Sequence, residues 1–100
     1  MENRIYLMDL FDLYGKLFTE KQQEYFIDYY FNNLTLAEIG ENNNISRAAV
    51  HSTIKEVEQK LIYYEDKIKL YKKRQEIEKV IDNLNLEQKN KIKKILEEEW

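Results

Sequence analysis

The near absence of turn-forming residues most restricts what this chain can fold into: it has no proline and only two glycines in 100 residues. Tight turns between β-strands rely on these two residues, so their scarcity favours helices joined by short polar turns. Hydrophobic residues make up 43% of the chain, enough for a packed core, and a chain of this length normally builds one core. We therefore predict an all-α protein with five or six helices in a single helical domain, residues 1–100.

Signals for helix starts divide the chain. Thr19–Gln22 and Thr35–Glu38 have the capping-box pattern, in which a threonine side chain and a Gln or Glu side chain three residues later cap each other's backbone N–H. Ser46 and Asn85 are further suitable N-caps. Asparagine tolerates the left-handed backbone better than most residues, so we predict a tight turn at residue 43 or 44.

Residues 34–60 have the pattern of a helix-turn-helix: a short capped helix, a three- or four-residue turn and a second helix. The predicted small core of this motif consists of Leu36, Ile39, Ile45, Val50 and Ile54. Ala37 and Ala49 are expected where the two helices cross closely. The residues expected to face outward, toward a major groove or another partner, are Ser46, Arg47, Ala48, His51, Ser52 and Lys55.

The C-terminal helices, residues 61–100, form a long extension of this motif. Apolar residues from Val50 to Tyr71 recur every seven residues, and a straight helix from Arg47 to Asn83 would be about 55 Å long. Such a helix either bends, near residues 63–67 or 72–75, and packs within the chain, or pairs with a second copy as a homodimer. The last helix is expected to end near Trp100, and the sequence assigns no role to residues 76–100.

Positive charge is concentrated after the predicted motif. Residues 1–33 and 34–60 have net charges of −3 and −1, whereas residues 61–81 have a net charge of +2. The second group of candidate binding residues is therefore Lys67, Lys69, Lys72, Lys73 and Arg74. This group could bind RNA phosphates or an acidic protein face. The alternative is a solvated helix surface stabilised by ion pairs between residues four apart.

The residue inventory argues against an enzyme. The chain has no cysteine, a single histidine, His51, and no glycine-rich loop that could bind phosphate. We therefore predict no catalytic residues, no cofactor and no metal site. No apolar run approaches the roughly 20 residues of a spanning helix, and the acidic N-terminal segment does not resemble a signal peptide. No membrane insertion is expected, and the expected location is the cytoplasm.

Several motifs, in one order along residues 5–75, resemble the YlxM family. These motifs are Leu10–Gln22, Tyr29-Tyr30, Leu34–Ile39, Ile45–Val50 and Tyr64–Lys67. The family consists of small bacterial helix-turn-helix proteins whose genes accompany the gene of Ffh, the GTPase of the signal recognition particle. The helix-turn-helix segment is also similar to region 4 of bacterial sigma factors, which reads promoter DNA. The resemblance thus implies a sigma region 4-like helix-turn-helix domain.

The resemblance implies an accessory or regulatory component of the signal recognition particle that binds Ffh, the particle's RNA or both. The alternative is a helix-turn-helix transcription regulator that binds DNA as a dimer. Three departures weigh against direct readout of DNA: the family usually has Gln, Tyr and a basic residue where this chain has Ala48, His51 and Glu56. Each departure removes a base or phosphate contact.

Overall fold

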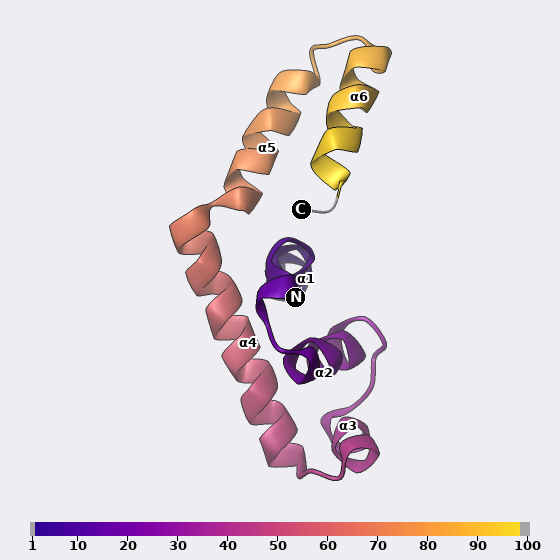
Figure 1. Cartoon of the computed structure of the whole chain (residues 1–100), viewed down its shortest axis with the longest axis vertical. Helices are drawn as coiled ribbons and strands as arrows, with labels where there is room; N and C mark the ends of the chain where they lie inside the picture. The colour runs from indigo at the N-terminus through magenta and orange to yellow at the C-terminus, as the bar shows by residue number, and fades with distance from the viewer. Residues whose placement is uncertain (1, 99–100) are drawn as a thin grey trace. The chain divides into compact units, whose positions relative to one another are not determined.

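The computed structural model describes residues 2–98, which form six α-helices, one short 3-10 helix and no β-strand (Figure 1). The all-α prediction is confirmed. Contacts divide the chain into two compact units, with unit 1 extending to Ile68 and unit 2 beginning at Lys69. This division differs from the predicted single domain with C-terminal helices from residue 61. The reason is local: α4 (Arg47–Ile68) runs unbroken to Ile68, and Lys69 then has a left-handed backbone with φ 61° and ψ 33°.

Unit 1 is organised around α4, and three shorter helices contact it: α1 (Glu2–Tyr14), α2 (Glu20–Tyr30) and α3 (Leu36–Asn43). Figure 1 shows all three on the same side of α4. The 3-10 helix η1 (Gly15–Leu17) joins α1 to α2. The core between these helices consists of Leu7, Leu10, Phe11, Tyr14, Phe18, Tyr25, Phe26, Tyr30, Ile39, Val50, Ile54, Val57 and Leu61.

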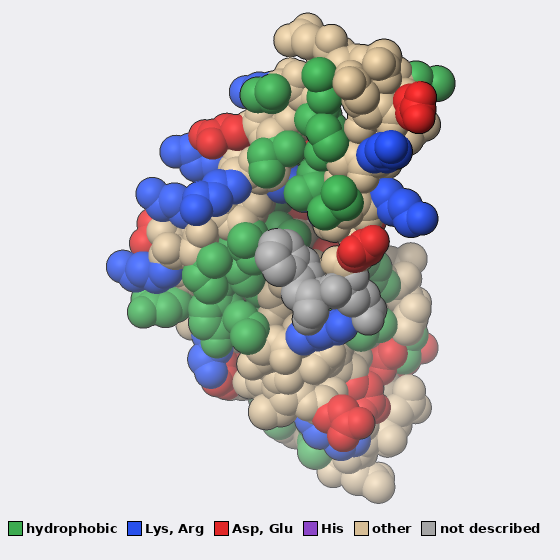
Figure 2. Space-filling view, turned by 45° about the horizontal axis from the view of Figure 1, so that its top comes forward, with side chains coloured by type: hydrophobic (Ala, Val, Ile, Leu, Met, Phe, Trp, Pro, Cys, Tyr) green, Lys and Arg blue, Asp and Glu red, His purple; other side chains and the backbone are tan. Residues whose placement is uncertain are grey.

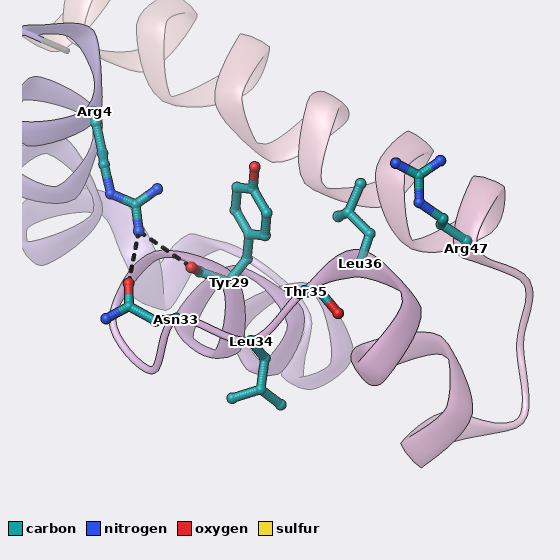
Figure 3. A pocket seen from close by; sticks show the side chains of 7 residues that line it. All are labelled: Arg4, Tyr29, Asn33, Leu34, Thr35, Leu36 and Arg47. Atoms are coloured by element: carbon teal, nitrogen blue, oxygen red, sulfur yellow. Dashed lines mark hydrogen bonds between the residues drawn. The ribbon is translucent and has the colours of Figure 1, made fainter.

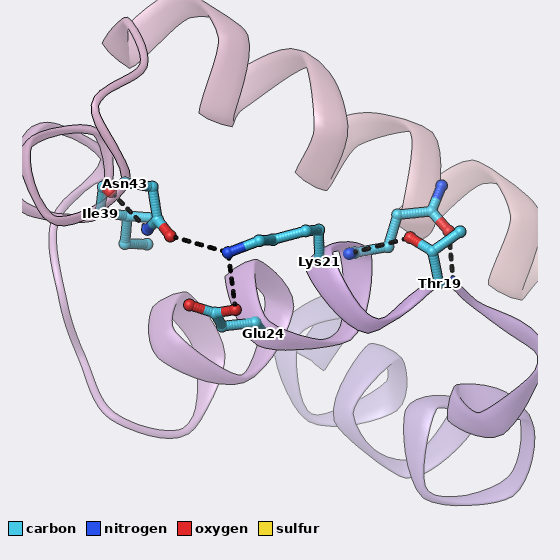
Figure 4. Close-up of polar contacts among 6 residues, drawn as sticks. Thr19, Lys21, Glu24, Ile39 and Asn43 are labelled. Atoms are coloured by element: carbon cyan, nitrogen blue, oxygen red, sulfur yellow. Dashed lines mark hydrogen bonds and ion pairs between the residues drawn. The ribbon is translucent and has the colours of Figure 1, made fainter.

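The predicted capping boxes are confirmed. The Thr19 hydroxyl accepts the backbone N–H of Gln22 at 3.2 Å, and the Gln22 side chain accepts the backbone N–H of Thr19 at 2.9 Å (Figure 4). Thr35 and Glu38 form the same reciprocal pair at 3.1 and 3.0 Å. The backbone N–H of Thr35, and then its hydroxyl, hold the pKa of the Glu38 carboxyl below its usual range. Both helices therefore begin where the local sequence predicts.

The turn of the helix-turn-helix is made by Asn44, with φ 55° and ψ 40°. Its neighbour Asn43 stays in α3, donating from its side-chain amide to the Ile39 carbonyl at 2.8 Å. The Asn43 amide oxygen also accepts from Lys21 Nζ at 3.4 Å, which links α2 to α3 (Figure 4). After the turn, the Ser46 hydroxyl accepts the backbone N–H of Ala49 at 3.0 Å and caps α4. The predicted turn and second helix are both confirmed.

The small core predicted for the motif is partly correct. Ile39, Val50 and Ile54 are buried. Leu36 is only half-buried, and Ile45 is exposed. Ile45 lies in the turn itself, where its backbone N–H donates to the Gly40 carbonyl at 3.0 Å. Its backbone therefore holds the turn, while its side chain adds little to the core.

The prediction that Ala37 and Ala49 mark the close helix crossing is wrong, because both side chains are exposed. The close approach is at Gly40, which is buried. A Cβ atom at Gly40 would lie 2.8 Å from the Ile45 carbonyl oxygen. The absence of a side chain at Gly40 thus lets the turn lie directly against α3.

Replacing Asn44 tests the turn. Asn44→Val is expected to lower the free energy of unfolding by about 1–2 kcal/mol, because a β-branched residue is strained in the left-handed region. Asn44→Gly should match or exceed the stability of the parent chain. Asn42→Val, at an exposed site inside α3, is the control and should cost only a few tenths of a kcal/mol. Urea unfolding followed by far-UV circular dichroism measures all three; equal losses for Asn44→Val and Asn42→Val would contradict the assignment.

Unit 2 is a hairpin of α5 (Leu70–Ile81) and α6 (Leu86–Glu97). The predicted start signal is confirmed, since the Asn85 side chain accepts the backbone N–H of Gln88 at 2.9 Å. The break before α5, at Lys69, falls between the two predicted bend regions. Trp100, the predicted end of the last helix, lies outside the described residues. Within residues 2–98, no helix combines the length and apolar character needed to cross a bilayer.

Candidate nucleic-acid interface

The first turns of α4 present one face to solvent. We call this surface the α4 face; it consists of Ser46, Arg47, Ala48, His51, Ser52 and Lys55, all of them exposed. The opposite side of the same turns holds Val50 and Ile54 in the core. Burial of Val50 and Ile54 in the core leaves the solvent side of these turns to the exposed residues. The structure thus brings together the whole first group of predicted site residues.

Two cations of the α4 face are available to a partner. Within residues 2–98, neither Arg47 nor Lys55 forms an ion pair. Glu56, the nearest acid in sequence, has its Oε1 atom 3.0 Å from Lys60 Nζ. An exposed pair of this kind contributes little to stability, but it offsets the charge of Glu56 beside the α4 face.

The positive charge of the α4 face is local, because the surrounding unit is acidic. Residues 1–68 contain seven Lys and Arg against twelve Asp and Glu, a net charge of −5. Attraction to phosphate falls off within about 10 Å at ordinary ionic strength, so nearby cations count more than the total charge. Whatever anion this unit binds must therefore be held by close contacts at a few basic residues.

An open hollow of about 400 Å³ lies beside the α4 face. Its lining consists of Arg4, Tyr29, Asn33, Leu34, Thr35, Leu36 and Arg47. No acidic residue lines it, and two arginines do. Figure 3 shows Tyr29 and Leu36 between the two guanidinium groups in that view. Two guanidiniums without a neighbouring carboxylate form a surface suited to an anion such as a phosphodiester.

Arg4 is fixed in this hollow by the end of α2. Its Nη2 atom donates to the carbonyls of Tyr30 at 2.8 Å and Tyr29 at 3.2 Å, and to the Asn33 side chain at 3.4 Å. Its guanidinium also lies 4.8 Å from the centre of the Tyr30 ring. Carbonyls at a helix C-terminus lack partners within the helix and attract cations. Arg4 is not among the residues predicted from the sequence, where its only signal is that no other basic residue precedes Lys16.

A second, smaller hollow shares Tyr29 and Leu36 with the first. Its other lining residues are His51, Ile54, Lys55 and Glu58. The Glu58 carboxylate accepts a hydrogen bond from the Tyr30 hydroxyl. Burial, and then this contact with Glu58, raise the pKa of Tyr30 above its ordinary value. The Tyr30 hydroxyl thus holds the Glu58 carboxylate toward α2.

The second group of predicted site residues is divided between the two units. Lys67 lies in the last turn of α4, whereas the others belong to unit 2, namely Lys69, Lys72, Lys73 and Arg74. Lys67 Nζ is 3.7 Å from Asp66 Oδ2. Arg74 Nε is 3.7 Å from Glu78 Oε1, a pair between residues four apart. These residues do not share one continuous helix, and two of them already have acidic neighbours.

The described residues contain no group of three or more His, Asp or Glu side chains placed to hold a metal ion. The α4 face presents guanidinium, ammonium, imidazole and hydroxyl groups on an exposed helix. These groups form hydrogen bonds and ion pairs with phosphates and base edges.

Comparison with known proteins agrees with this architecture. The model of family UPF0122, described as "Putative helix-turn-helix protein, YlxM / p13 like", matches residues 1–99. A UPF0122 protein of Malacoplasma penetrans is 48% identical over 80 residues, 77% of this chain and 75% of the relative. One from Clostridium botulinum is 44% identical over 91 residues, which are 91% of this chain and 84% of the relative. One from Fusobacterium nucleatum is 37% identical over 98 residues, which are 97% of this chain and 95% of the relative.

Proposed function

Because the chain belongs to the UPF0122 family of YlxM/p13-like helix-turn-helix proteins, we propose that it binds double-stranded DNA through the α4 face. The observation that carries this proposal is the exposed start of α4, where Arg47 and Lys55 have no acidic partner among residues 2–98. In helix-turn-helix proteins the first residues of the second helix contact base edges in the major groove. Sequence-selective binding would make the protein a transcription regulator.

Each part of the surface then has a distinct role. Arg47 can donate two hydrogen bonds to the O6 and N7 atoms of guanine, and Ser52 can bond to several bases. Lys55, one turn further along, is placed for the sugar-phosphate backbone. Arg4 and the hollow it shares with Arg47 supply a second backbone contact, since no carboxylate opposes a phosphate there.

The acidic residues around the α4 face imply a modest affinity for DNA that depends on a few close contacts. Two cations, Lys55 and Arg4, contact phosphates in this proposal, so log K should fall with log salt concentration with a slope of about −2. A net charge of −5 in residues 1–68 opposes non-specific binding. Binding to random DNA at physiological salt is therefore expected to be weak, with affinity concentrated at selected sequences.

Charge removal on the α4 face tests the proposal. Arg47→Ala should raise the Kd for a selected duplex by about 5- to 30-fold, since one bidentate base contact contributes about 1–2 kcal/mol. Lys55→Ala should weaken all duplexes alike and reduce the salt slope by about 1. Fluorescence anisotropy measures both, with duplexes selected from a randomised pool and titrations from about 0.05 to 0.2 M salt.

The matched control is Lys91→Ala, which removes an exposed lysine from α6 and should leave affinity unchanged. Two results would contradict the proposal: no duplex enriched above background at low salt, or equal losses for Lys91→Ala and Arg47→Ala. Far-UV circular dichroism of each variant separates a lost contact from a lost fold.

The signal recognition particle is a second candidate partner, supported by the resemblance to the YlxM family. The net charge of −5 in residues 1–68 favours a basic protein surface over DNA phosphates. We propose that unit 1 then contacts Ffh, while the basic residues of α5 contact the particle's RNA. Binding of the purified protein to Ffh, to the RNA and to their complex tests this role, and retention by none of the three would contradict it. Either role places the protein in the cytoplasm.

A further inference from the structure

The α5–α6 hairpin has an apolar face that its own two helices leave largely open. Ile81 is the buried residue of α5, and α6 has none among its described residues. Yet both helices carry aliphatic residues at helical spacing, namely Ile77, Val80, Ile81, Ile92, Ile95 and Leu96, and Leu84 lies in the turn between the helices. A helix with such a stripe normally packs that stripe against another element.

These side chains form a groove along the hairpin. Its apolar lining consists of Ile77, Val80, Ile81, Leu84 and Ile92, and Lys73 and Glu76 also line it. Val80 is 68% exposed. Ile95, 67% exposed, follows Ile92 by three residues and lies on the same side of α6. Figure 2 shows hydrophobic side chains gathered over this part of the chain.

The size of unit 2 makes an open groove unfavourable. Two 12-residue helices form a unit of about 30 residues, and units below about 40 residues usually require a metal, disulfides or oligomerisation for stability. This chain has no cysteine. Within residues 2–98 no cluster of metal-binding side chains occurs either. Of the three stabilising devices, only association with another chain is therefore left for unit 2.

A second copy of the chain suits the groove in area and in charge. The exposed parts of Ile77, Val80, Leu84 and Ile95 amount to an apolar patch on the order of 400 Å². Two such patches with their polar borders would bury about 1,000 Å² in total. This is about the smallest area that specific protein–protein interfaces bury. One lysine and one glutamate line the groove, so its formal charge is zero. Two copies would therefore not repel each other at this groove. A strongly charged partner would find no net electrostatic attraction there.

We propose that this groove is covered by the same groove of a second copy, and that the two hairpins form a four-helix bundle. Paired hairpins related by a two-fold axis place the same residues on both sides of the interface. Helices packed in this way bury a continuous aliphatic stripe from each chain. The inference does not rest on either proposed function, because association is measured without nucleic acid or Ffh.

Mass measurement of the full chain tests this inference. Sedimentation velocity and light scattering at about 100 µM should give twice the 12.3 kDa of one chain. Val80→Glu and Ile95→Glu should each raise the dimer dissociation constant at least about tenfold, because each would bury an unpaired carboxylate. Both side chains are mostly exposed in the single chain, so neither change should disturb its fold.

The matched control is Ile5→Glu, at a residue of α1 that is 66% exposed, and it should leave the mass unchanged. A monomeric parent chain at that concentration would overturn the inference. So would a dimer that survives both Val80→Glu and Ile95→Glu, or one that Ile5→Glu dissociates equally. Far-UV circular dichroism confirms helicity, and Val80→Ser with Ile95→Ser provides a milder second test should either glutamate variant lose helix.

Discussion

Phe26→Ala is expected to lower the free energy of unfolding by about 3–5 kcal/mol, the largest effect of any single change considered for this chain. The Phe26 side chain is 0% exposed. Its ring stacks on Phe11 with centroids 4.4 Å apart and on Tyr30 with centroids 4.3 Å apart. Alanine would leave a cavity among rings that belong to α1 and α2 and cannot close it fully.

Urea unfolding followed by far-UV circular dichroism measures this loss. Domains of this size are commonly stable by about 5–15 kcal/mol, so the variant should lose a large part of its stability and unfold at a clearly lower urea concentration than the parent chain. Phe31→Ala is the control: its ring is 40% exposed and lies 6.4 Å from the Phe26 ring. A loss at Phe26 no larger than the loss at Phe31 would show that the ring stack is not the centre of the core.

Tyr14→Phe is expected to cost about 1.5–3 kcal/mol, because it removes one hydroxyl from a buried hydrogen bond to a carboxyl. The Tyr14 hydroxyl donates to Glu65 Oε1 at 2.7 Å, and the two residues are 1% and 8% exposed. The contact joins α1 to the C-terminal part of α4, across 51 positions of sequence. Without this donor, the buried carboxyl loses a partner that water cannot readily replace.

A double-mutant cycle separates this contact from packing. Tyr14→Phe and Glu65→Leu should each destabilise the chain, whereas the combined variant should recover part of the sum, since neither polar group then lacks its partner. Urea unfolding of the four proteins gives the coupling free energy. Strict additivity of the two single effects would contradict a direct contribution of this hydrogen bond.

The helix starts could be predicted because an N-cap is decided within four residues. Thr19, Thr35, Ser46 and Asn85 each accept the backbone N–H three residues later, as their sequence neighbours predict. The left-handed turn at Asn44 follows from the same kind of local information. The α4 face was likewise predictable, since helical periodicity determines which residues point away from Val50 and Ile54.

Contacts between distant segments could not be predicted. The seven-residue apolar pattern continues from Leu61 to Tyr64 and Ile68, but Ile68 is exposed, and the residue buried one turn after Leu61 is Glu65. The Tyr14 hydroxyl donates a hydrogen bond to that glutamate from a segment 51 positions away. The break at Lys69 lacks the usual Gly or Asn signal, so the end of α4 could not be read from the sequence.

The guanidinium of Arg4 contributes both to the stability of unit 1 and to the proposed binding surface. It ties the end of α2 to α1 through two carbonyls, and it lines the hollow proposed to receive phosphate. Lysine would keep the charge but lose the planar fork that reaches several acceptors at once. A single codon change at this position would therefore affect stability and ligand affinity together, and natural selection could not adjust one without the other.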